Sequence, residues 1–244
     1  MKKIGFFVLS LMVCSCSDEN NCFSSKGKEV SELVHLPPFS TIDIPMHVKV
    51  QLIESEEYKM EIVSYENLID QLNYQVQNHQ LVLTNKFSCS MLHSYQTAFL
   101  KIYAPNLQMI HSRTQFQVFS TDTLHYPQLE LKTSLPSESA SSTFDLMLDA
   151  QYIYVEDNQV GKFDLKGKTQ KLTIKLYGAN GVVDARNLVA DSVYFYHRSN
   201  QNIHIMPQFY LEGIISSVGN VYSYHRPDTE NITRLYTGQL FYIE

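Results

Sequence analysis

From residue 143 onward the chain repeats at an interval of 19 or 20 residues, and this period restricts the possible folds more than any other feature. Each repeat begins with a short strand-like stretch, carries a second one near its middle and closes on a polar or glycine turn. One coil of a parallel β-solenoid has this layout, and because a coil cannot bury its inner face alone, several must stack. The repeats cover residues 143–161, 162–181, 182–201 and 202–220, and a fifth begins at Val221.

The repeat also indicates which positions point inward and where the chain turns. If coils stack in register, apolar residues two apart at the start of each coil form ladders on the inner face. These are Phe163 with Leu165, Val183 with Ala185, and Ile203 with Ile205. The expected turns are at Gly161, Asn180–Gly181, Asn200–Gln201 and Gly219–Asn220. Because the repeats share little sequence identity, an antiparallel β-sandwich with hairpins at the same interval is the alternative.

The sequence before the repeat is also typical of β-structure. Stretches such as TIDIPMHVKVQLI and AFLKIYAP alternate apolar with polar residues, as half-buried strands do. The one helical candidate is residues 64–72, and residues 120–142 break the rhythm and are expected to be an insertion. We therefore predict a single all-β domain over residues 31–244.

Residues 1–15 have the layout of a secretory signal. Two lysines precede an apolar run that ends at Val13, and this run is too short for a membrane-spanning helix of about 20 residues. A small residue followed by cysteine resembles the lipobox of bacterial lipoproteins, in which the cysteine carries the lipid. Cys16, preceded by Ser15, fits this pattern better than Cys14, which follows a bulky valine.

The polar residues 16–30 are expected to form a flexible tether. The SDEN that follows Cys16 resembles the signal that exports Bacteroidetes lipoproteins to the outer face of the outer membrane; the periplasmic face is the alternative. An exported compartment permits a disulfide between Cys22 in the tether and Cys89 in the domain, although the sequence does not show how far apart they lie. Two cysteines without paired histidines are no zinc site.

The charge of the chain restricts its partners. Removing residues 1–15 leaves 17 basic and 25 acidic residues, a net charge of about −8 with histidine neutral. Proteins that bind nucleic acid carry basic patches, so nucleic acid is not an expected partner. Membrane contact is expected through the lipid and not through surface charge.

Several segments resemble, in the same order, those of a known family. FSTIDIPMHVKVQLI and YKMEIVSYENLIDQLNYQVQNHQLVLTN, followed by FDLKGKTQKLTIKLYGANGVVDARNLVADSVYFYHRS and GNVYSYHRP, are similar to the putative adhesin family with a head GIN domain. The match covers most of residues 35–244, although these coils carry more tyrosine and less glycine and serine than is usual there. The resemblance implies a right-handed β-helix on an exported, often lipid-anchored Bacteroidetes protein.

Three aspartates occupy the same position in successive repeats. Asp145, Asp164 and Asp184 are 19 and 20 residues apart, so stacked coils would place them about 4.8 Å apart on one face. Stacked carboxylates repel, which raises their pKa values or attracts a cation. Such a ladder would suit a calcium or catalytic site, but nearby basic residues favour a neutralised ladder: Lys162, Lys166 and Arg186.

The pattern Tyr-x-Tyr-His-Arg occurs twice, and its alternation places the two tyrosines of each copy on one face. Adjacent rings with an arginine form a candidate platform for sugar rings or anionic groups. The copies are 28 residues apart, which is not one coil, so they could occupy different surfaces. The candidate ligand-binding residues are Tyr194, Tyr196, Arg198, Tyr222, Tyr224 and Arg226.

The sequence contains no recognisable catalytic constellation. It has no G-x-S-x-G, P-loop or G-x-G-x-x-G motif, and its nine histidines lack metal-ligand spacing. We therefore expect no catalytic residue, metal or cofactor. The expected function is a non-enzymatic envelope lipoprotein whose β-helix presents an adhesive surface to a glycan or protein. The alternatives are a carbohydrate-active β-helix enzyme and a periplasmic envelope scaffold, and the ligand and oligomeric state are left open.

Overall fold

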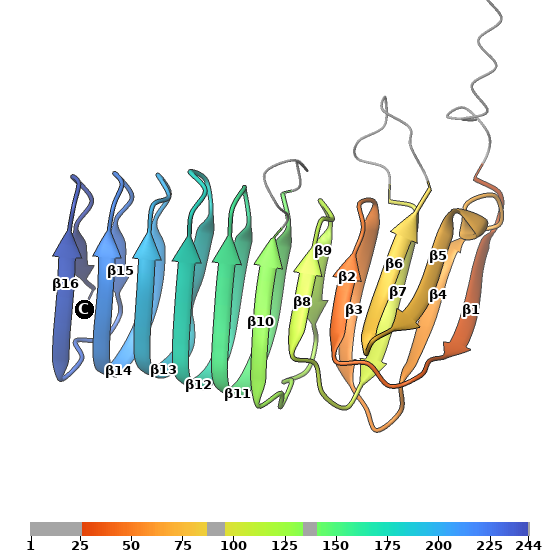
Figure 1. The fold of residues 1–244 in the computed structure, drawn as a ribbon, viewed down its shortest axis with the longest axis horizontal. Helices are drawn as coiled ribbons and strands as arrows, with labels where there is room; N and C mark the ends of the chain where they lie inside the picture. The colour runs from red at the N-terminus through yellow and green to blue at the C-terminus, as the bar shows by residue number, and fades with distance from the viewer. Residues whose placement is uncertain (1–25, 87–95, 134–140, 244) are drawn as a thin grey trace, which may run out of the picture.

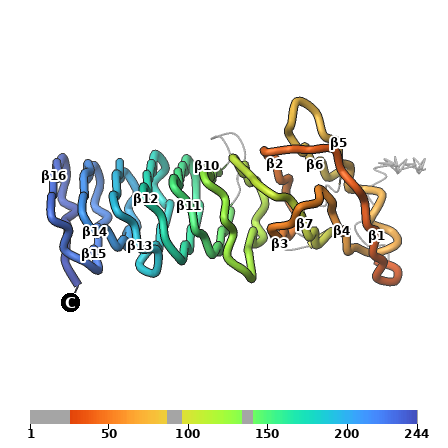
Figure 2. The backbone as a smooth tube through the Cα atoms, turned by 90° about the horizontal axis from the view of Figure 1, so that it is seen from below, coloured from red at the N-terminus to blue at the C-terminus, as the bar shows by residue number. Residues whose placement is uncertain are grey.

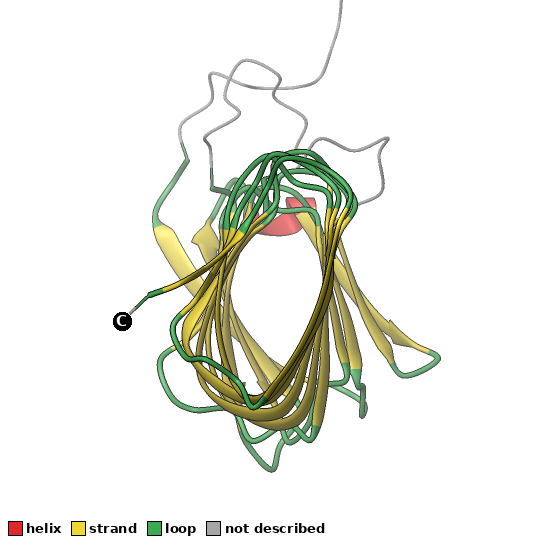
Figure 3. Cartoon of the chain, turned by 90° about the vertical axis from the view of Figure 1, so that its left-hand side faces the viewer, coloured by secondary structure: helices red, strands yellow, loops and turns green. Residues whose placement is uncertain are grey.

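The computed structural model describes residues 26–86, 96–133 and 141–243, which form a right-handed parallel β-solenoid (Figure 1). In Figure 1 the front strands run upward, the chain returns behind them, and from the middle of the chain each later coil lies to the left, which is right-handed winding. Seen along its axis, the solenoid is a flattened tube with two β-walls (Figure 3). The predicted parallel β-helix is confirmed, and the antiparallel sandwich is wrong.

The strands are short in the N-terminal half, whereas in the first four repeats one long, bent strand makes most of a coil. The N-terminal half contains β1 (Glu29–His35), β2 (Thr41–Ile44), β3 (Val48–Glu54), β4 (Lys59–Tyr65), β5 (Leu72–Gln77), β6 (Gln80–Asn85), β7 (Ala98–Ala104), β8 (Met109–Ser112), β9 (Gln117–Ser120) and β10 (Gln128–Thr133). The repeat region contains β11 (Thr143–Asp157), β12 (Lys162–Leu176), β13 (Val182–His197), β14 (Ile203–Ile215), β15 (Val221–Ser223), β16 (Thr229–Arg234) and β17 (Leu240–Tyr242).

Strand pairing defines the two walls. Wall 1 contains, in spatial order, β1, β4, β7, β3, β9, the first halves of β11 to β14, β15 and β17. Wall 2 contains β5, β6, β2, β8, β10, the second halves of β11 to β14, and β16. Within a coil the chain passes from wall 1 to wall 2 through a bend, and it reaches the next coil through a turn. The turns lie at the top of Figure 1 and occur where they were predicted in the repeat region.

The first coil in the sequence is not the first coil in space. β2 pairs with both β6 and β8, and β3 pairs with both β7 and β9. Figure 1 shows this by colour, since the orange β2 and β3 lie between the yellow β6 and β7 and the yellow-green β8 and β9. Beyond β7, the antiparallel strands β4 and β1 end wall 1, and β5, antiparallel to β6, ends wall 2.

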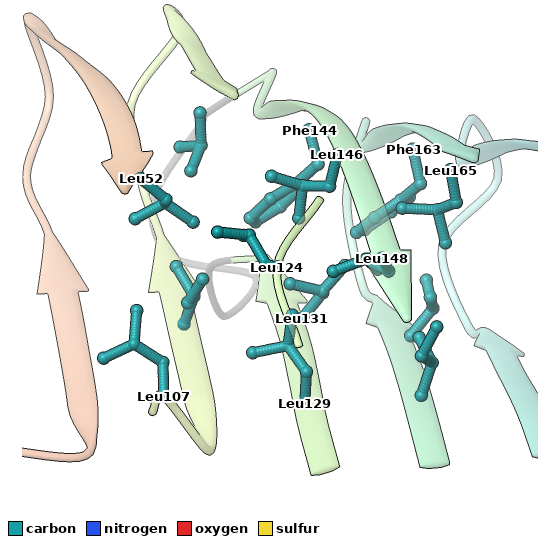
Figure 4. Packing of buried hydrophobic residues seen from close by; sticks show 14 of the residues in the cluster. Leu52, Leu107, Leu124, Leu129, Leu131, Phe144, Leu146, Leu148, Phe163 and Leu165 are labelled. Atoms are coloured by element: carbon teal, nitrogen blue, oxygen red, sulfur yellow. The ribbon is translucent and has the colours of Figure 1, made fainter. Parts of the chain in front are cut away.

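The core consists of side-chain ladders that cross from coil to coil. Phe144, Phe163 and Val183 stand at one register position, and the rings of Phe144 and Phe163 stack with their centroids 5.1 Å apart. Figure 4 shows these rings and the leucines beside them filling the space between the walls. Burying one such side chain contributes about 1.5–3 kcal/mol. All six residues predicted to form inward ladders are fully buried, namely Phe163, Leu165, Val183, Ala185, Ile203 and Ile205.

Three sequence-based expectations about local structure need correction. The predicted helix over residues 64–72 is wrong, because β4 continues to Tyr65 by pairing with β1, and only the 3₁₀ turn η1 (Ile69–Gln71) follows. Residues 120–142 are not simply an insertion, since β9 and β10 form a coil against β11. The tether was expected to reach residue 30, but β1 begins at Glu29. In the described part of the chain no helix has the length and apolar content needed to cross a membrane.

The last described coil has polar side chains at inward positions. Glu230 follows the buried Leu211 in register, and Tyr242 follows the buried Ser223. The Tyr242 hydroxyl donates a hydrogen bond to the Glu230 carboxylate, and the Arg226 guanidinium lies 4.1 Å from the centroid of the Tyr242 ring. Burial and the neighbouring Glu230 carboxylate raise the pKa of Tyr242 to about 12. This polar closure of the coil interior is the kind of device that discourages further stacking of strands.

Gly167 is required at the bend between the two halves of β12. Its φ is +108°, and a Cβ there would lie 2.1 Å from the Leu148 carbonyl oxygen. We expect Gly167→Ala to lower the free energy of unfolding by at least about 2 kcal/mol in chemical denaturation, because strain and a backbone clash combine. Gln170→Ala, at an exposed position in the same bend, should change it by less than about 0.5 kcal/mol. Equal stability of both variants would contradict this account.

Candidate functional site

The predicted aspartate ladder exists on the outer surface of wall 1. Asp145, Asp164 and Asp184 occupy one register position in β11, β12 and β13. The Lys166 Nζ lies 2.8 Å from Asp145 Oδ1 and 3.5 Å from Asp164 Oδ1, and the Arg186 Nε lies 2.8 Å from Asp184 Oδ1. Two of the three basic residues predicted to neutralise the ladder therefore do so.

The electrostatics of this ladder favour charged, paired carboxylates. Burial acts to raise the pKa of Asp184, but hydrogen bonds from the Arg186 side chain and backbone outweigh it and hold that pKa below its usual value. The hydrogen bond to Asp145 raises the pKa of Lys166. A catalytic acid needs the opposite, a carboxyl whose pKa is raised. Within the described residues no three metal-binding side chains gather in one place.

The second tyrosine motif joins the end of this ladder. His204 follows Asp184 in register, its ring stacks on Tyr222 with centroids 5.1 Å apart, and its Nδ1 lies 3.0 Å from the Tyr224 hydroxyl. The Arg186 guanidinium lies 5.1 Å from the centroid of the Tyr224 ring. Burial and the Arg186 charge lower the pKa of His204. The polar groups of this cluster thus mainly bind one another.

The first tyrosine motif lies elsewhere, on wall 2. Tyr194 and Tyr196 belong to the second half of β13, whereas Tyr222 lies in β15 on wall 1. Arg198 is exposed where the turn after β13 begins, and Arg226 packs on Tyr242. The six residues therefore form no single platform, as their 28-residue spacing allowed.

The outer surface of wall 2 carries most of the tyrosines of the repeat region. Their rings form pairs, among them Tyr194 with Tyr210 at 5.4 Å and Tyr196 with Tyr177 at 5.6 Å. The Lys171 ammonium lies 4.7 Å from the centroid of Tyr194, a cation–π contact. We call this surface the tyrosine face; its tyrosines are Tyr152, Tyr154, Tyr177, Tyr194, Tyr196 and Tyr210.

The hydroxyls of the tyrosine face fall into two groups. The Tyr154 hydroxyl donates to Glu156 Oε2 at 2.7 Å, and the Tyr210 hydroxyl donates to Glu212 Oε2 at 2.5 Å. In the described chain the hydroxyls of Tyr194 and Tyr196 make no such bond. These two rings, with Lys175, Glu212 and Ile214, line a groove of about 220 Å³.

The groove combines chemical groups that suit a sugar or a polar side chain. Tyrosine offers an apolar ring face and a hydroxyl donor, and Lys175 makes no ion pair among the described residues. Asn231 and Thr233 of the next coil line the same groove and add amide and hydroxyl groups. Tyr194 and Tyr196, both predicted site residues, thus line this groove with their hydroxyls unpaired among the described residues.

Sequence reasoning missed a larger cavity, which lies at the bends of β11, β12 and β13. It has a volume of about 490 Å³ and is lined by Ala150, Thr169, Gln170 and Asp191, among others. A signal was present in the sequence, because small residues recur at this point of each repeat: Ala150, Thr169 and Ala190.

Three predicted site residues lie outside the described residues. They are Cys16, expected to carry the lipid, and Cys22 and Cys89, considered for a disulfide.

A comparison with protein families identifies the chain. The family model described as putative auto-transporter adhesin, head GIN domain, matches residues 38–227. The chain belongs to this family. The resemblance noted in the sequence is thereby confirmed, and no curated protein matches the chain.

Solved structures share the fold of this head GIN domain protein. A putative adhesin from Bacteroides fragilis superposes with a TM-score of 0.76 at 18% identity, covering 88% of this chain and 97% of that one. A protein described as a putative lipid binding protein from Parabacteroides distasonis gives 0.67 at 12% identity, covering 89% and 98%. A putative adhesin from Parabacteroides merdae gives 0.59 at 14% identity, covering 89% and 97%. At these identities the likeness shows a common fold.

His197 differs from the other motif residues because it is fully buried. It ends β13 at an inward position between Leu176 and Ile215 of the neighbouring coils. Burial lowers its pKa to about 4, and the nearby backbone of Gly219 and Gln201 offsets only part of this effect. Neither ring nitrogen makes a well-formed hydrogen bond within the described chain. The imidazole is therefore neutral in the folded protein at pH 7.

We expect His197 to make stability depend on pH below about 6.5. Between about pH 6.5 and 4 the unfolded chain binds a proton at this residue that the folded protein does not. Stability should therefore fall over that range, by up to about 3 kcal/mol from this group. Denaturant titrations at pH 7 and pH 4.5 measure the difference. His197→Leu, which matches its apolar neighbours, should reduce the pH dependence by that amount, and an unchanged dependence would refute the assignment.

Proposed function

We propose that this protein is a non-enzymatic lipoprotein of the bacterial outer membrane, anchored through Cys16 and exposed at the cell surface. Its solenoid stands beyond a short tether and binds a glycan or protein ligand through the tyrosine face. The groove beside Tyr194 and Tyr196 receives the ligand, and the lipid provides the contact with the membrane.

The distribution of unpaired polar groups carries this proposal. On wall 1, Lys166 pairs with Asp145 and Asp164, Arg186 pairs with Asp184, and His204 lies within hydrogen-bond distance of the Tyr224 hydroxyl. On wall 2, Tyr194, Tyr196 and Lys175 leave their polar ends available. A surface with satisfied groups has little to offer a ligand, while free donors beside aromatic rings can replace bound water by specific contacts. The family description and the solved neighbours named putative adhesins support a binding role.

An enzymatic role on polysaccharide fits this molecule less well. Glycoside hydrolysis ordinarily uses two carboxyl groups, one with a raised pKa that acts as the acid. The ladder aspartates are ion-paired, and the pKa of Asp184 is lowered. A periplasmic scaffold would keep the same fold but face inward, and protease treatment of intact cells separates the two locations: a surface protein is removed and a periplasmic one is protected.

The lipid register gives a direct test of the anchor. Cys16→Ala should abolish incorporation of a labelled fatty acid, because the lipid would lose its attachment atom, while Cys14→Ala should leave it intact. Cells that express each variant are grown with the labelled fatty acid, and the label is measured on the isolated protein. The opposite result would place the anchor at Cys14, and labelling of neither parent nor variant would remove the lipoprotein from the proposal.

The tyrosine face is tested by a binding screen with glycan arrays, matrix proteins and whole cells. A hit should weaken roughly tenfold or more in the double variant Tyr194→Ala/Tyr196→Ala, because each ring contributes about 0.5–1.5 kcal/mol beyond its buried area. Tyr74→Ala removes an exposed ring from β5, at the other end of the solenoid, and serves as the control. Absence of any binding partner, or equal weakening by both variants, would count against the proposed face.

A further inference from the structure

The cavity at the bends spans several coils along one edge of the solenoid. These bends face the viewer in Figure 2, which looks at the molecule from below. His125 and Pro127 line the cavity from the coil that precedes β11, and its other residues come from β11, β12 and β13. Its volume of about 490 Å³ lies within the range of about 300–1,000 Å³ that is usual for small-molecule sites. We call it the bend trough.

Two rows of side chains form the rims of the trough. One rim contains Asp149, Lys168 and Val189, which are aligned in the register of β11, β12 and β13. The other contains Gln151, Gln170 and Asp191, each placed just before the aligned residues Tyr152, Lys171 and Ser192. Between the rims lie the buried Ala150 and Thr169, whose small side chains leave the trough concave, and the buried Ala190 continues their row in β13. Each rim therefore repeats once per coil, about every 4.8 Å.

Some polar groups of the trough are paired within the protein, and others are not. The Lys168 Nζ lies 3.1 Å from Asp149 Oδ2, and the Thr169 hydroxyl donates to backbone carbonyl oxygens. Among the described residues the side chains of Gln151, Gln170 and Asp191 have no partner. Two amides and a carboxylate on one rim thus present donors and acceptors in a row toward the cavity.

This arrangement fits a neutral, hydroxyl-rich polymer. Planar amide and carboxylate groups can each bind two neighbouring hydroxyls, and a repeat of about 4.8 Å is close to the length of one sugar ring in an extended chain. The ion pair of Asp149 with Lys168 leaves Asp191 as the uncompensated charge, which repels polyanions.

An extended peptide fits the trough less well. The trough runs across the strands, and the backbone groups of these coils already pair with neighbouring coils, so a peptide cannot add as a further strand. Apolar side chains at the rim are few, with Val189 and Pro127 the largest, so a peptide would find no deep side-chain pocket.

We propose that the bend trough is a second binding site, which holds a neutral oligosaccharide chain along the solenoid axis. Successive sugar rings lie against successive coils, and Gln151, Gln170 and Asp191 bind their hydroxyls. The site is separate from the groove beside Tyr194 and Tyr196, so it stands whether or not the tyrosine face binds a ligand.

Affinity gel electrophoresis of the mature protein tests the site with soluble polysaccharides as probes. Dextran, mannan and xyloglucan are the neutral probes, and heparin and polygalacturonate are the anionic ones. We expect at least one neutral polysaccharide to retard the protein and the anionic ones not to. Oligosaccharides of that polymer should compete better as they lengthen to roughly three or four rings, the span of the trough.

Variants assign the binding to the trough. Gln170→Ala and Asp191→Ala should each weaken retardation about tenfold, and Val189→Trp should weaken it as strongly by filling the trough. Gln201→Ala makes the same change as Gln170→Ala at an exposed position in the opposite turn, and it should bind like the parent protein. Thermal unfolding of each variant confirms that the fold is retained.

The outcomes separate this site from the tyrosine face. Retardation that survives Tyr194→Ala/Tyr196→Ala but is lost in the trough variants supports the proposal. Loss in the tyrosine variant alone would overturn it and favour the tyrosine face. No retardation by any neutral polysaccharide, retardation by the anionic ones only, or binding of extended peptides in their place would also overturn it.

Discussion

The whole molecule depends on the parallel hydrogen bonding of one coil to the next. A single coil cannot bury its own inner side chains. They are buried only when the neighbouring coils place apolar side chains at the same register position. Phe144 pairs in register with Phe163, and Val183 with Ile203, and bulges shift the register only locally between β12, β13 and β14. The same register that buries the inner ladders aligns the outer side chains into rows outside these bulges, and so it determines which chemical groups can meet on the surface.

A structure built this way must deal with its ends, and the two ends do so differently. Beyond the coil of β6 and β7, the chain reverses direction, so β1 and β4 end wall 1 as antiparallel strands and β5 ends wall 2. At the other end, the last described coil keeps the parallel pairing but changes the inward residues. Glu230 and Tyr242 bind each other where the preceding coil has Leu211 and Ser223, so another apolar coil would meet two polar side chains beside Ile232 and Leu240.

The 19- or 20-residue period predicted the stacked coils of the repeat region, because there each coil pairs with the next one in the sequence. The interval from Asp145 to Asp164 to Asp184 fixed both the register and the stacking of the ladder. The placement of β2 and β3 between later coils could not be read in this way, because it depends on pairing between segments with no common period. The helix expected near Ile69 failed for a related reason: β4 gains more by pairing with β1 and β7 than its last residues would gain from a helical turn.

The candidate sites were likewise only partly predictable, because the neighbouring coil decides whether a polar group is paired. Sequence identified Tyr194 and Tyr222 as equals, yet one lies beside unpaired groups in a groove and the other stacks on His204 within a satisfied cluster. What separates them is the neighbouring coil, which places His204 against Tyr222 but places Glu212 and Asn231 in the groove beside Tyr194. In a solenoid, therefore, what a residue can bind depends on the side chains at the same register position in the neighbouring coils. The rows with unpaired polar ends are those in which adjacent coils fail to supply a complementary partner, as in the row of Gln151, Gln170 and Asp191.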